Sequence, residues 1–385
     1  MEKKEKFLEI DGLRGICAFM VVLSHYIVAF FPGAYFGEKF PSHMKYNLDY
    51  YLSESPLSLI YAGNFAVFIF LVISGVSLSK SFYNNKDNIA RTATNRYLRL
   101  CIPISVSTLI IAVFMKFSMF YSTQASYITG SSEWLRIAYD FPLNIKEMLS
   151  VTLFDVFFIG NCKYNVIFWM MSVLFYGSFL TLFIVNTWGN MKRRIIIYIM
   201  IVGILCKLNQ VYYTPFVFGI ICTDLATNYK NILNIICKKN INVILLILGA
   251  YLGSYPTDRV PTSELYTWFY IGPISSALYH SVGAFMVVLG LMSSGRIKRI
   301  LLHKYFQYLG KISFSIFLVH IIVICSFSCY VFIKLYAITQ KYQTSAIITF
   351  VPSIIIMIIF AHLFYKLIEK NSTKIISRVD RIFFS

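Results

Sequence analysis

Ten long apolar stretches constrain this chain more than any other feature of its sequence. A helix needs about 20 apolar residues to cross the hydrocarbon core of a bilayer. Backbone groups in lipid must also be hydrogen-bonded within the protein, which favours helices. We therefore predict an all-α, polytopic integral membrane protein with about ten transmembrane helices. The stretches lie at residues 12–32, 58–80, 98–120, 166–187, 193–207, 211–227, 241–255, 272–292, 313–335 and 345–368.

The composition agrees with this class of protein. Hydrophobic residues make up 58% of the chain and charged residues only 14%, whereas soluble domains carry about 25% charged residues. The net charge of +18 is spread over short clusters between the apolar stretches and is not gathered on one domain. We therefore expect the lipid bilayer as a partner and exclude nucleic acid.

The distribution of lysine and arginine predicts an orientation. Cytoplasmic loops of membrane proteins carry an excess of basic residues. If the N-terminus is cytoplasmic, most of the 35 Lys and Arg residues fall on the inner side, including those at 192–194, 296–311 and 366–381. Both termini are then cytoplasmic in a multi-pass protein of the plasma or inner membrane. The long outer segment at 121–165 is a candidate cover for an acceptor site.

The chemistry of the chain is concentrated in its first apolar stretch. Asp11 is a candidate N-cap for the first helix. Arg14 and His25 are eleven residues apart, which is about 16.5 Å along a helix and within about 20° of the same face. Arginine binds phosphate bidentately, and a histidine within a span is costly and suited to proton transfer. The pair suggests an anionic donor at the cytoplasmic mouth with a base deeper in. Alternatively, Arg14 is an orientation charge and His25 is bonded to a neighbouring helix.

Segments along most of the chain resemble acyltransferase family 3 membrane proteins. Residues 8–15 contain Asp-Gly-Leu-Arg-Gly, and Arg14 and His25 reproduce the family's Arg-x10-His. Residues 63–75 resemble the family's apolar run into Ser-Gly, and residues 95–103 its Arg-x-x-Arg-Leu followed by proline. Residues 308–320 are similar to its Leu-Gly-x-Ile-Ser-Tyr-Ser motif ending in histidine, and residues 364–370 to its closing Ile-Glu-Lys. These segments occur in the family's order.

The resemblance implies a transferase that moves an acyl group across the membrane. We expect O-acetylation, with acetyl-CoA or another acyl-CoA as the cytoplasmic donor and no metal. The expected acceptor is a hydroxyl group outside the cytoplasm, most often on a cell-surface polysaccharide or other glycan. Polysaccharide modification of this kind would also involve separate glycan-assembly proteins as partners.

The resemblance also suggests roles for individual residues. Arg14 would bind the anionic groups of the donor, and His25 would act as the catalytic base. Arg96 and Arg99 would bind donor phosphates, unless they are orientation charges that contact lipid headgroups. For His320, a packed and hydrogen-bonded histidine is an equal alternative to a place in the cavity. The candidate cavity-lining residues are Ser74, Trp169 and His320.

Two features separate this chain from the family pattern. Leu174 stands where the family has an acid after its Trp-Ser/Thr-Leu motif, and Asn371 replaces the closing proline. The chain ends soon after the last predicted span, so we expect a single transmembrane domain over 1–385 with no appended soluble domain. The alternatives are a multi-span transporter and a catalytically inactive family-like assembly component, and Leu174 favours the second of these.

Overall fold

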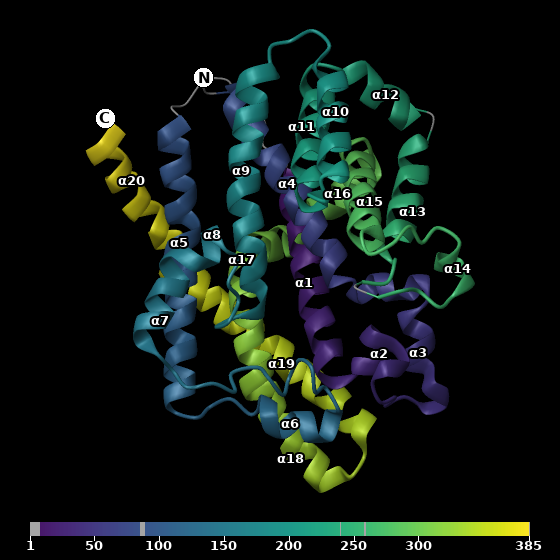
Figure 1. The fold of residues 1–385 in the computed structure, drawn as a ribbon, viewed down its shortest axis with the longest axis vertical. Helices are drawn as coiled ribbons and strands as arrows, with labels where there is room; N and C mark the ends of the chain where they lie inside the picture. The colour runs from purple at the N-terminus through teal and green to yellow at the C-terminus, as the bar shows by residue number, and fades with distance from the viewer. Residues whose placement is uncertain (1–7, 85–88, 239, 258, 385) are drawn as a thin grey trace. The chain divides into compact units, whose positions relative to one another are not determined.

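The structure is a computed structural model, and it describes residues 8–84, 89–238, 240–257 and 259–384 (Figure 1). All regular elements in these residues are helices, which confirms the predicted all-α class. The main long helices are α1 (Leu8–Phe30), α4 (Gly63–Asn84), α5 (Ile89–Lys116), α9 (Trp169–Trp188), α15 (Ser275–Met292), α17 (Lys304–Val323), α18 (Cys329–Thr339), α19 (Tyr342–Phe364) and α20 (Lys370–Phe384).

Two of the candidate spans each consist of two α-helices that are joined by a π-helical turn. The π-helical turn Ile324–Ser328 joins α17 to α18, and the turn Tyr365–Glu369 joins α19 to α20. With these joined, the described residues contain 7 helices long and apolar enough to cross a membrane, or up to 8 if a bent helix pair is counted. These apolar helices fit a membrane protein in a bilayer.

The predicted stretches at 193–207, 211–227 and 241–255 are helical but short. They form α10 (Arg194–Lys207), α11 (Thr214–Thr227) and α13 (Ile241–Gly253), and α12 (Lys230–Lys238) forms the bent pair with α13. The number of ten spans and the cytoplasmic side of the termini therefore stay predictions. Short helices fill the connecting segments: α2 (Pro32–Phe36), α3 (Leu48–Ser53), α6 (Ser122–Thr129), α7 (Ile145–Ser150), α8 (Val156–Phe158), α14 (Glu264–Thr267) and α16 (Gly295–Leu301).

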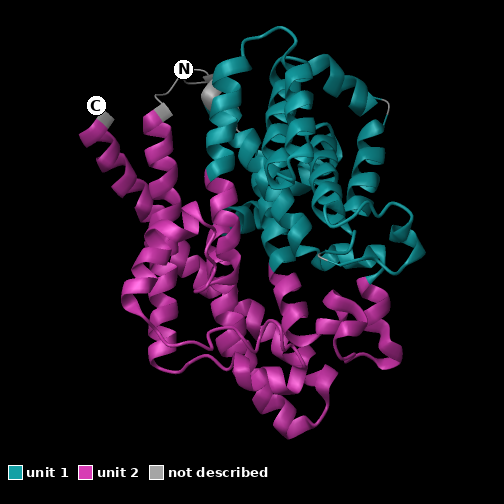
Figure 2. Ribbon diagram, viewed as in Figure 1, with its two compact units in different colours: residues 1–21, 54–87, 176–313 teal, residues 22–53, 88–175, 314–385 magenta. Residues whose placement is uncertain are grey.

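The chain divides into two compact units (Figure 2). Unit 1 comprises residues 1–21, 54–87 and 176–313, and unit 2 comprises residues 22–53, 88–175 and 314–385. In unit 1, α4 packs against α11 and α15, and α13 packs against α15. In unit 2, α5 packs against α20, and α18 packs against α6 and α19.

Close packing in unit 1 depends on glycines. A Cβ atom on Gly219 of α11 would lie 2.4 Å from the carbonyl oxygen of Val72, and one on Gly75 of α4 would lie 2.4 Å from that of Phe216. Small residues let helix backbones approach this closely in membrane proteins, where packing replaces the hydrophobic effect as the driving force. This explains the glycine that ends the segment at 63–75.

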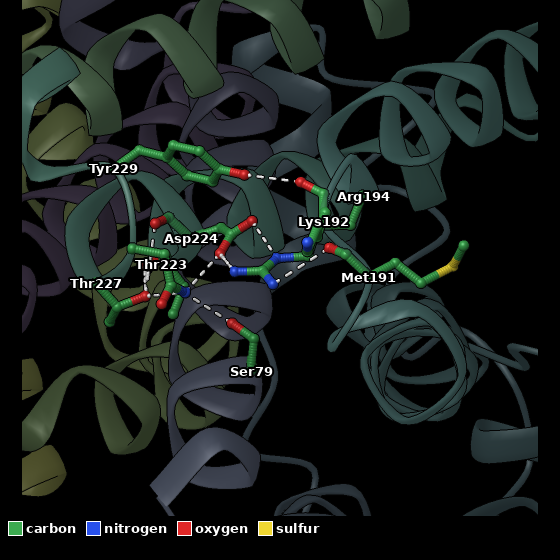
Figure 3. Close-up of polar contacts among 9 residues, drawn as sticks. Ser79, Met191, Lys192, Arg194, Thr223, Asp224, Thr227 and Tyr229 are labelled. Atoms are coloured by element: carbon green, nitrogen blue, oxygen red, sulfur yellow. Dashed lines mark hydrogen bonds and ion pairs between the residues drawn. The ribbon is translucent and has the colours of Figure 1, made fainter.

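A buried ion pair joins the start of α10 to the end of α11 in unit 1 (Figure 3). Arg194 donates from Nε to Oδ2 of Asp224 over 2.7 Å and from Nη2 to Oδ1 over 2.5 Å. The Asn228 amide donates to the same carboxylate over 2.7 Å. Asp224 is fully buried, and a bidentate pair with an extra donor is the arrangement that such a carboxylate requires. We interpret this cluster as structural.

Candidate functional site

His25 lies beside His320 within unit 2. His25 is on α1 and is half-buried, whereas His320 is on α17 and is fully buried. The Nδ1 atom of His25 is 3.2 Å from Nε2 of His320, and the ring centroids are 5.0 Å apart. The two histidines, 295 positions apart in the sequence, therefore form one hydrogen-bonded pair. Each histidine is thus hydrogen-bonded to a neighbouring helix, which was one of the sequence-based alternatives for each residue. The partner in both cases is a histidine.

Backbone carbonyls fix the direction of this hydrogen bond. Nδ1 of His320 is 2.7 Å from the carbonyl oxygen of Phe317 and 3.1 Å from that of Ile316. Carbonyl oxygens only accept, so Nδ1 of His320 carries the proton and its Nε2, in the neutral ring, is an acceptor. His25 must then donate from Nδ1, which makes its Nε2 the nitrogen with the basic lone pair. A partner that sets the tautomer in this way is a common feature of functional histidines.

Two buried polar side chains bind the helix that carries His320, two residues before that histidine. Ser107 of α5 donates to the carbonyl oxygen of Leu318 over 3.2 Å, and Asn165 donates to the same oxygen over 3.3 Å. Both side chains are buried, where an unmade hydrogen bond would cost about 1–3 kcal/mol. These contacts oppose rotation of α17 and so stabilise the position of His320.

An aromatic side chain from a connecting segment lies against His25. The centroid of Trp134 is 5.6 Å from that of His25, with an interplanar angle of 34°. Trp134 follows α6 in the segment 121–165, which is the predicted cover for the acceptor site. Sequence reasoning did not assign Trp134 to the site. The available signal was a lone tryptophan in the longest segment expected outside the membrane.

A polar cluster in unit 2 links this segment to the one that contains α2 and α3. The buried carboxylate of Asp49 accepts from Ser42 Oγ at 2.5 Å and from the backbone N–H of His43 at 2.8 Å. The His43 ring bonds through Nε2 to the carbonyl oxygen of Thr129 at 2.7 Å and stacks on Tyr342 at 3.8 Å. Burial lowers the pKa of His43, while the bond to Thr129 and the charge of Asp49 oppose this shift.

Arg14 lies in unit 1, where its guanidinium contacts Asp11 and Ser77. Its Nη1 is 3.1 Å from Oδ1 of Asp11, and its Nη2 donates to Oγ of Ser77 over 2.9 Å. The Arg14 side chain remains 31% exposed. The prediction that Asp11 caps the helix is wrong, because α1 already begins at Leu8. Asp11 instead orients Arg14 from one turn away.

The glycines around Arg14 allow α1 to touch the start of α17. A Cβ atom on Gly310 would lie 1.8 Å from the carbonyl oxygen of Asp11, and one on Gly15 would lie 2.7 Å from the backbone nitrogen of Gly310. No side chain fits in such a contact, which lies entirely within unit 1. The glycines of the segments 8–15 and 308–320 are thus explained by packing, and they hold the backbone that carries Arg14.

The other predicted site residues are distributed over both units. Arg96 and Arg99 lie on α5 in unit 2, where Arg96 is half-buried and Arg99 is exposed. Ser74 is buried on α4 in unit 1, and the half-buried Trp169 begins α9 in unit 2. Arg14 belongs to the other unit, and a shared donor site for Arg14, Arg96 and Arg99 stays a prediction. So does the placement of Ser74, Trp169 and His320 around one cavity.

Comparison with known proteins identifies one matching family and two curated relatives. The sequence profile of the acyltransferase domain of acyltransferase family 3 matches residues 7–366. The chain is 26% identical over 148 residues to Acyltransferase R4 of Phoma sp., which is 36% of this chain and 32% of that protein. It is also 26% identical over 147 residues to Acyltransferase clz18 of Cochliobolus lunatus, which is 36% of this chain and 31% of that protein.

The chain therefore matches about a third of the length of either relative. No solved structure matches it significantly. The family profile, by contrast, covers nearly the whole chain and includes both Arg14 and His25. The chain belongs to acyltransferase family 3.

Proposed function

We propose that this protein is an acyltransferase that moves an acetyl group from cytoplasmic acetyl-CoA to a hydroxyl of an acceptor outside the cytoplasm, most directly a cell-surface polysaccharide. The observation that carries this proposal is the directed hydrogen bond from His25 to His320. It makes Nε2 of His25 a base within a helix long and apolar enough to span the membrane. A base in such a place matches a reaction that removes the proton of an acceptor hydroxyl.

The proposed reaction uses this base directly. The acceptor oxygen attacks the thioester carbonyl and forms the ester bond while the carbon–sulfur bond breaks. Nε2 of His25 takes the hydroxyl proton as the oxygen attacks, and that proton can pass to the departing thiolate of coenzyme A. A general base of this kind contributes about 10²–10⁴-fold to a rate.

In this proposal, Arg14 binds the acetyl-CoA donor. Its planar fork suits the phosphates of coenzyme A, and Asp11 and Ser77 already hold that fork in place. Since α1 is one helix from Leu8 to Phe30, its rise of about 1.5 Å per residue leads from Arg14 towards His25. The pantetheine arm of the donor would follow this direction.

The experiment measures transfer of labelled acetyl groups by membranes that contain the protein. Wild-type membranes should label the glycan fraction from radiolabelled acetyl-CoA, and His25→Ala should reduce the rate by about 10²–10⁴-fold at equal protein level. His362→Ala is the matched control, because His362 is an exposed histidine on α19 without a role in the proposal. Near-wild-type transfer by His25→Ala would overturn the mechanism. Substrate flux without acyl transfer would favour a transporter.

A further inference from the structure

We propose that the indole of Trp134 is one wall of the acceptor site and selects acceptors with an apolar ring face, such as a pyranose sugar. This inference rests on the proposed function and adds the residue that recognises the ring of the acceptor. The observations that support it are the position of Trp134 beside His25, the way its segment is anchored, and the chemistry of an acceptor hydroxyl.

The first observation is the geometry of the two rings. Trp134 and His25 are separated by 5.6 Å between centroids and are tilted by 34°. An acceptor hydroxyl must come within about 2.6–3.2 Å of the base that deprotonates it. A sugar ring is several ångströms wide, so a sugar with a hydroxyl at the His25 imidazole lies within reach of the indole.

The second observation is that Trp134 stands on an anchored segment. Three residues before it, Ser131 is buried and donates to the carbonyl oxygen of Val28 on α1 over 2.9 Å. The next residue, Leu135, is fully buried. The N–H of Tyr121 bonds to the carbonyl oxygen of Cys325, in the π-helical turn that follows α17, over 2.9 Å. The segment is thereby tied to helix α1, which carries His25, and to the turn next to the helix that carries His320.

The third observation concerns the surface that Trp134 offers. The indole is half-buried, and tryptophan combines a large apolar face with a polar N–H at one edge. A pyranose also has an apolar face of C–H groups with hydroxyls around its rim. Stacking of the two faces would leave the rim hydroxyls free to reach His25. It would also exclude water, which competes with the acceptor for the acyl group.

The proposed orientation of the protein in the membrane favours the acceptor, and not the acyl chain of the donor, as the group that lies against Trp134. The segment 121–165 is expected outside the cytoplasm, and Trp134 lies at the His25 part of α1. The donor is expected to enter at the opposite end of that helix, near Arg14. We therefore expect the indole of Trp134 to contact the acceptor and not the donor.

The test compares two acceptors with the purified full-length protein in nanodiscs. Methyl glucopyranoside offers a ring face, and sorbitol offers hydroxyls without one. Trp134→Ala should raise KM for the glucopyranoside roughly tenfold, as expected from loss of an aromatic stacking contact, and should leave KM for acetyl-CoA unchanged. It should also increase acetyl-CoA hydrolysis relative to transfer. KM for sorbitol should change little.

Two further variants keep the test independent of folding. Trp134→Phe retains an aromatic face and should recover most of the acceptor affinity. Tyr127→Ala is the matched control, because Tyr127 is an aromatic residue of α6 that is 73% exposed and it should behave like wild type. Size-exclusion chromatography checks that each variant is monodisperse.

The outcomes separate this inference from the proposed function. If wild type transfers to neither acceptor, the proposed function fails and the role of Trp134 fails with it. If wild type transfers normally and Trp134→Ala keeps its KM for the glucopyranoside, only the role of Trp134 is wrong. If Trp134→Ala instead raises KM for acetyl-CoA alone, the indole contacts the donor and the acceptor assignment is overturned.

Discussion

Replacement of His320 by leucine tests whether this residue sets the tautomer of His25. In the wild type, Nδ1 of His25 donates to Nε2 of His320 over 3.2 Å. Leucine is of similar size but accepts no hydrogen bond. The His25 ring should then redistribute towards the tautomer with its proton on Nε2, which cannot act as a base at that atom. We expect a lower kcat with little change in KM for acetyl-CoA, because His320 acts through His25.

The magnitude follows from the lost hydrogen bond. A buried donor without an acceptor costs about 1–3 kcal/mol, and this free energy corresponds to about 5–150-fold in an equilibrium. The ratio of the productive to the unproductive tautomer should fall by this factor, and kcat should fall in proportion to the population of the productive tautomer that remains. His320→Gln places an amide oxygen near the position of Nε2 and keeps an acceptor, so it should lose less activity than His320→Leu.

A double-mutant cycle on acetyl transfer separates this role from a general effect on packing. His25→Ala alone should remove the full contribution of the base, about 10²–10⁴-fold. The double variant His25→Ala/His320→Leu should then be no slower than His25→Ala, because the partner has nothing left to orient. Residues that act as one unit show such non-additivity. Full additivity of the two losses, or wild-type activity in His320→Leu, would refute the reasoning.

Arg14→Lys should raise KM for acetyl-CoA at unchanged expression, because lysine keeps the charge and loses the bidentate fork; unchanged donor kinetics would reduce Arg14 to an orientation charge. Asp224→Asn should lower the free energy of unfolding in detergent by about 3–5 kcal/mol, since it breaks a buried ion pair, and an unchanged melting temperature would contradict this interpretation. The lowered pKa of His43 means that its folded-state pKa lies below the unfolded value of about 6.5. Its contribution to stability is therefore complete above pH ~6.5 and is lost as the pH falls through and below that value; His43→Gln should flatten a melting-temperature profile over this range, and an equal acid loss in both proteins would exclude His43. With the native cysteines replaced, an impermeant thiol reagent should label Ser132→Cys but not Arg299→Cys in intact cells, because the basic clusters predict that the latter is cytoplasmic; the reverse pattern would invert the topology.

The sequence alone was sufficient for features that depend on local pattern. A long stretch of apolar residues in a bilayer satisfies its backbone hydrogen bonds within itself only as a helix, and each of the ten predicted stretches is helical over most of its length in the structure. The eleven-residue spacing of Arg14 and His25 predicts a common face on one helix, and α1 runs without a break from Leu8 to Phe30. The number of spans was less accessible, since α10, α11 and α13 are short and apolar length alone does not decide whether such helices cross a membrane.

The surroundings of His25 were decided by tertiary structure. His320 is 295 positions away, and its role remained open in the sequence because a histidine in an apolar helix is equally compatible with packing. Only the packing of α17 places its Nε2 against Nδ1 of His25, and only the carbonyls of Ile316 and Phe317 decide which nitrogen carries the proton. Trp134 had no periodic relation to His25 at all. Its contact exists because hydrogen bonds to distant parts of the chain anchor its segment, and no local spacing encodes the position of such a segment.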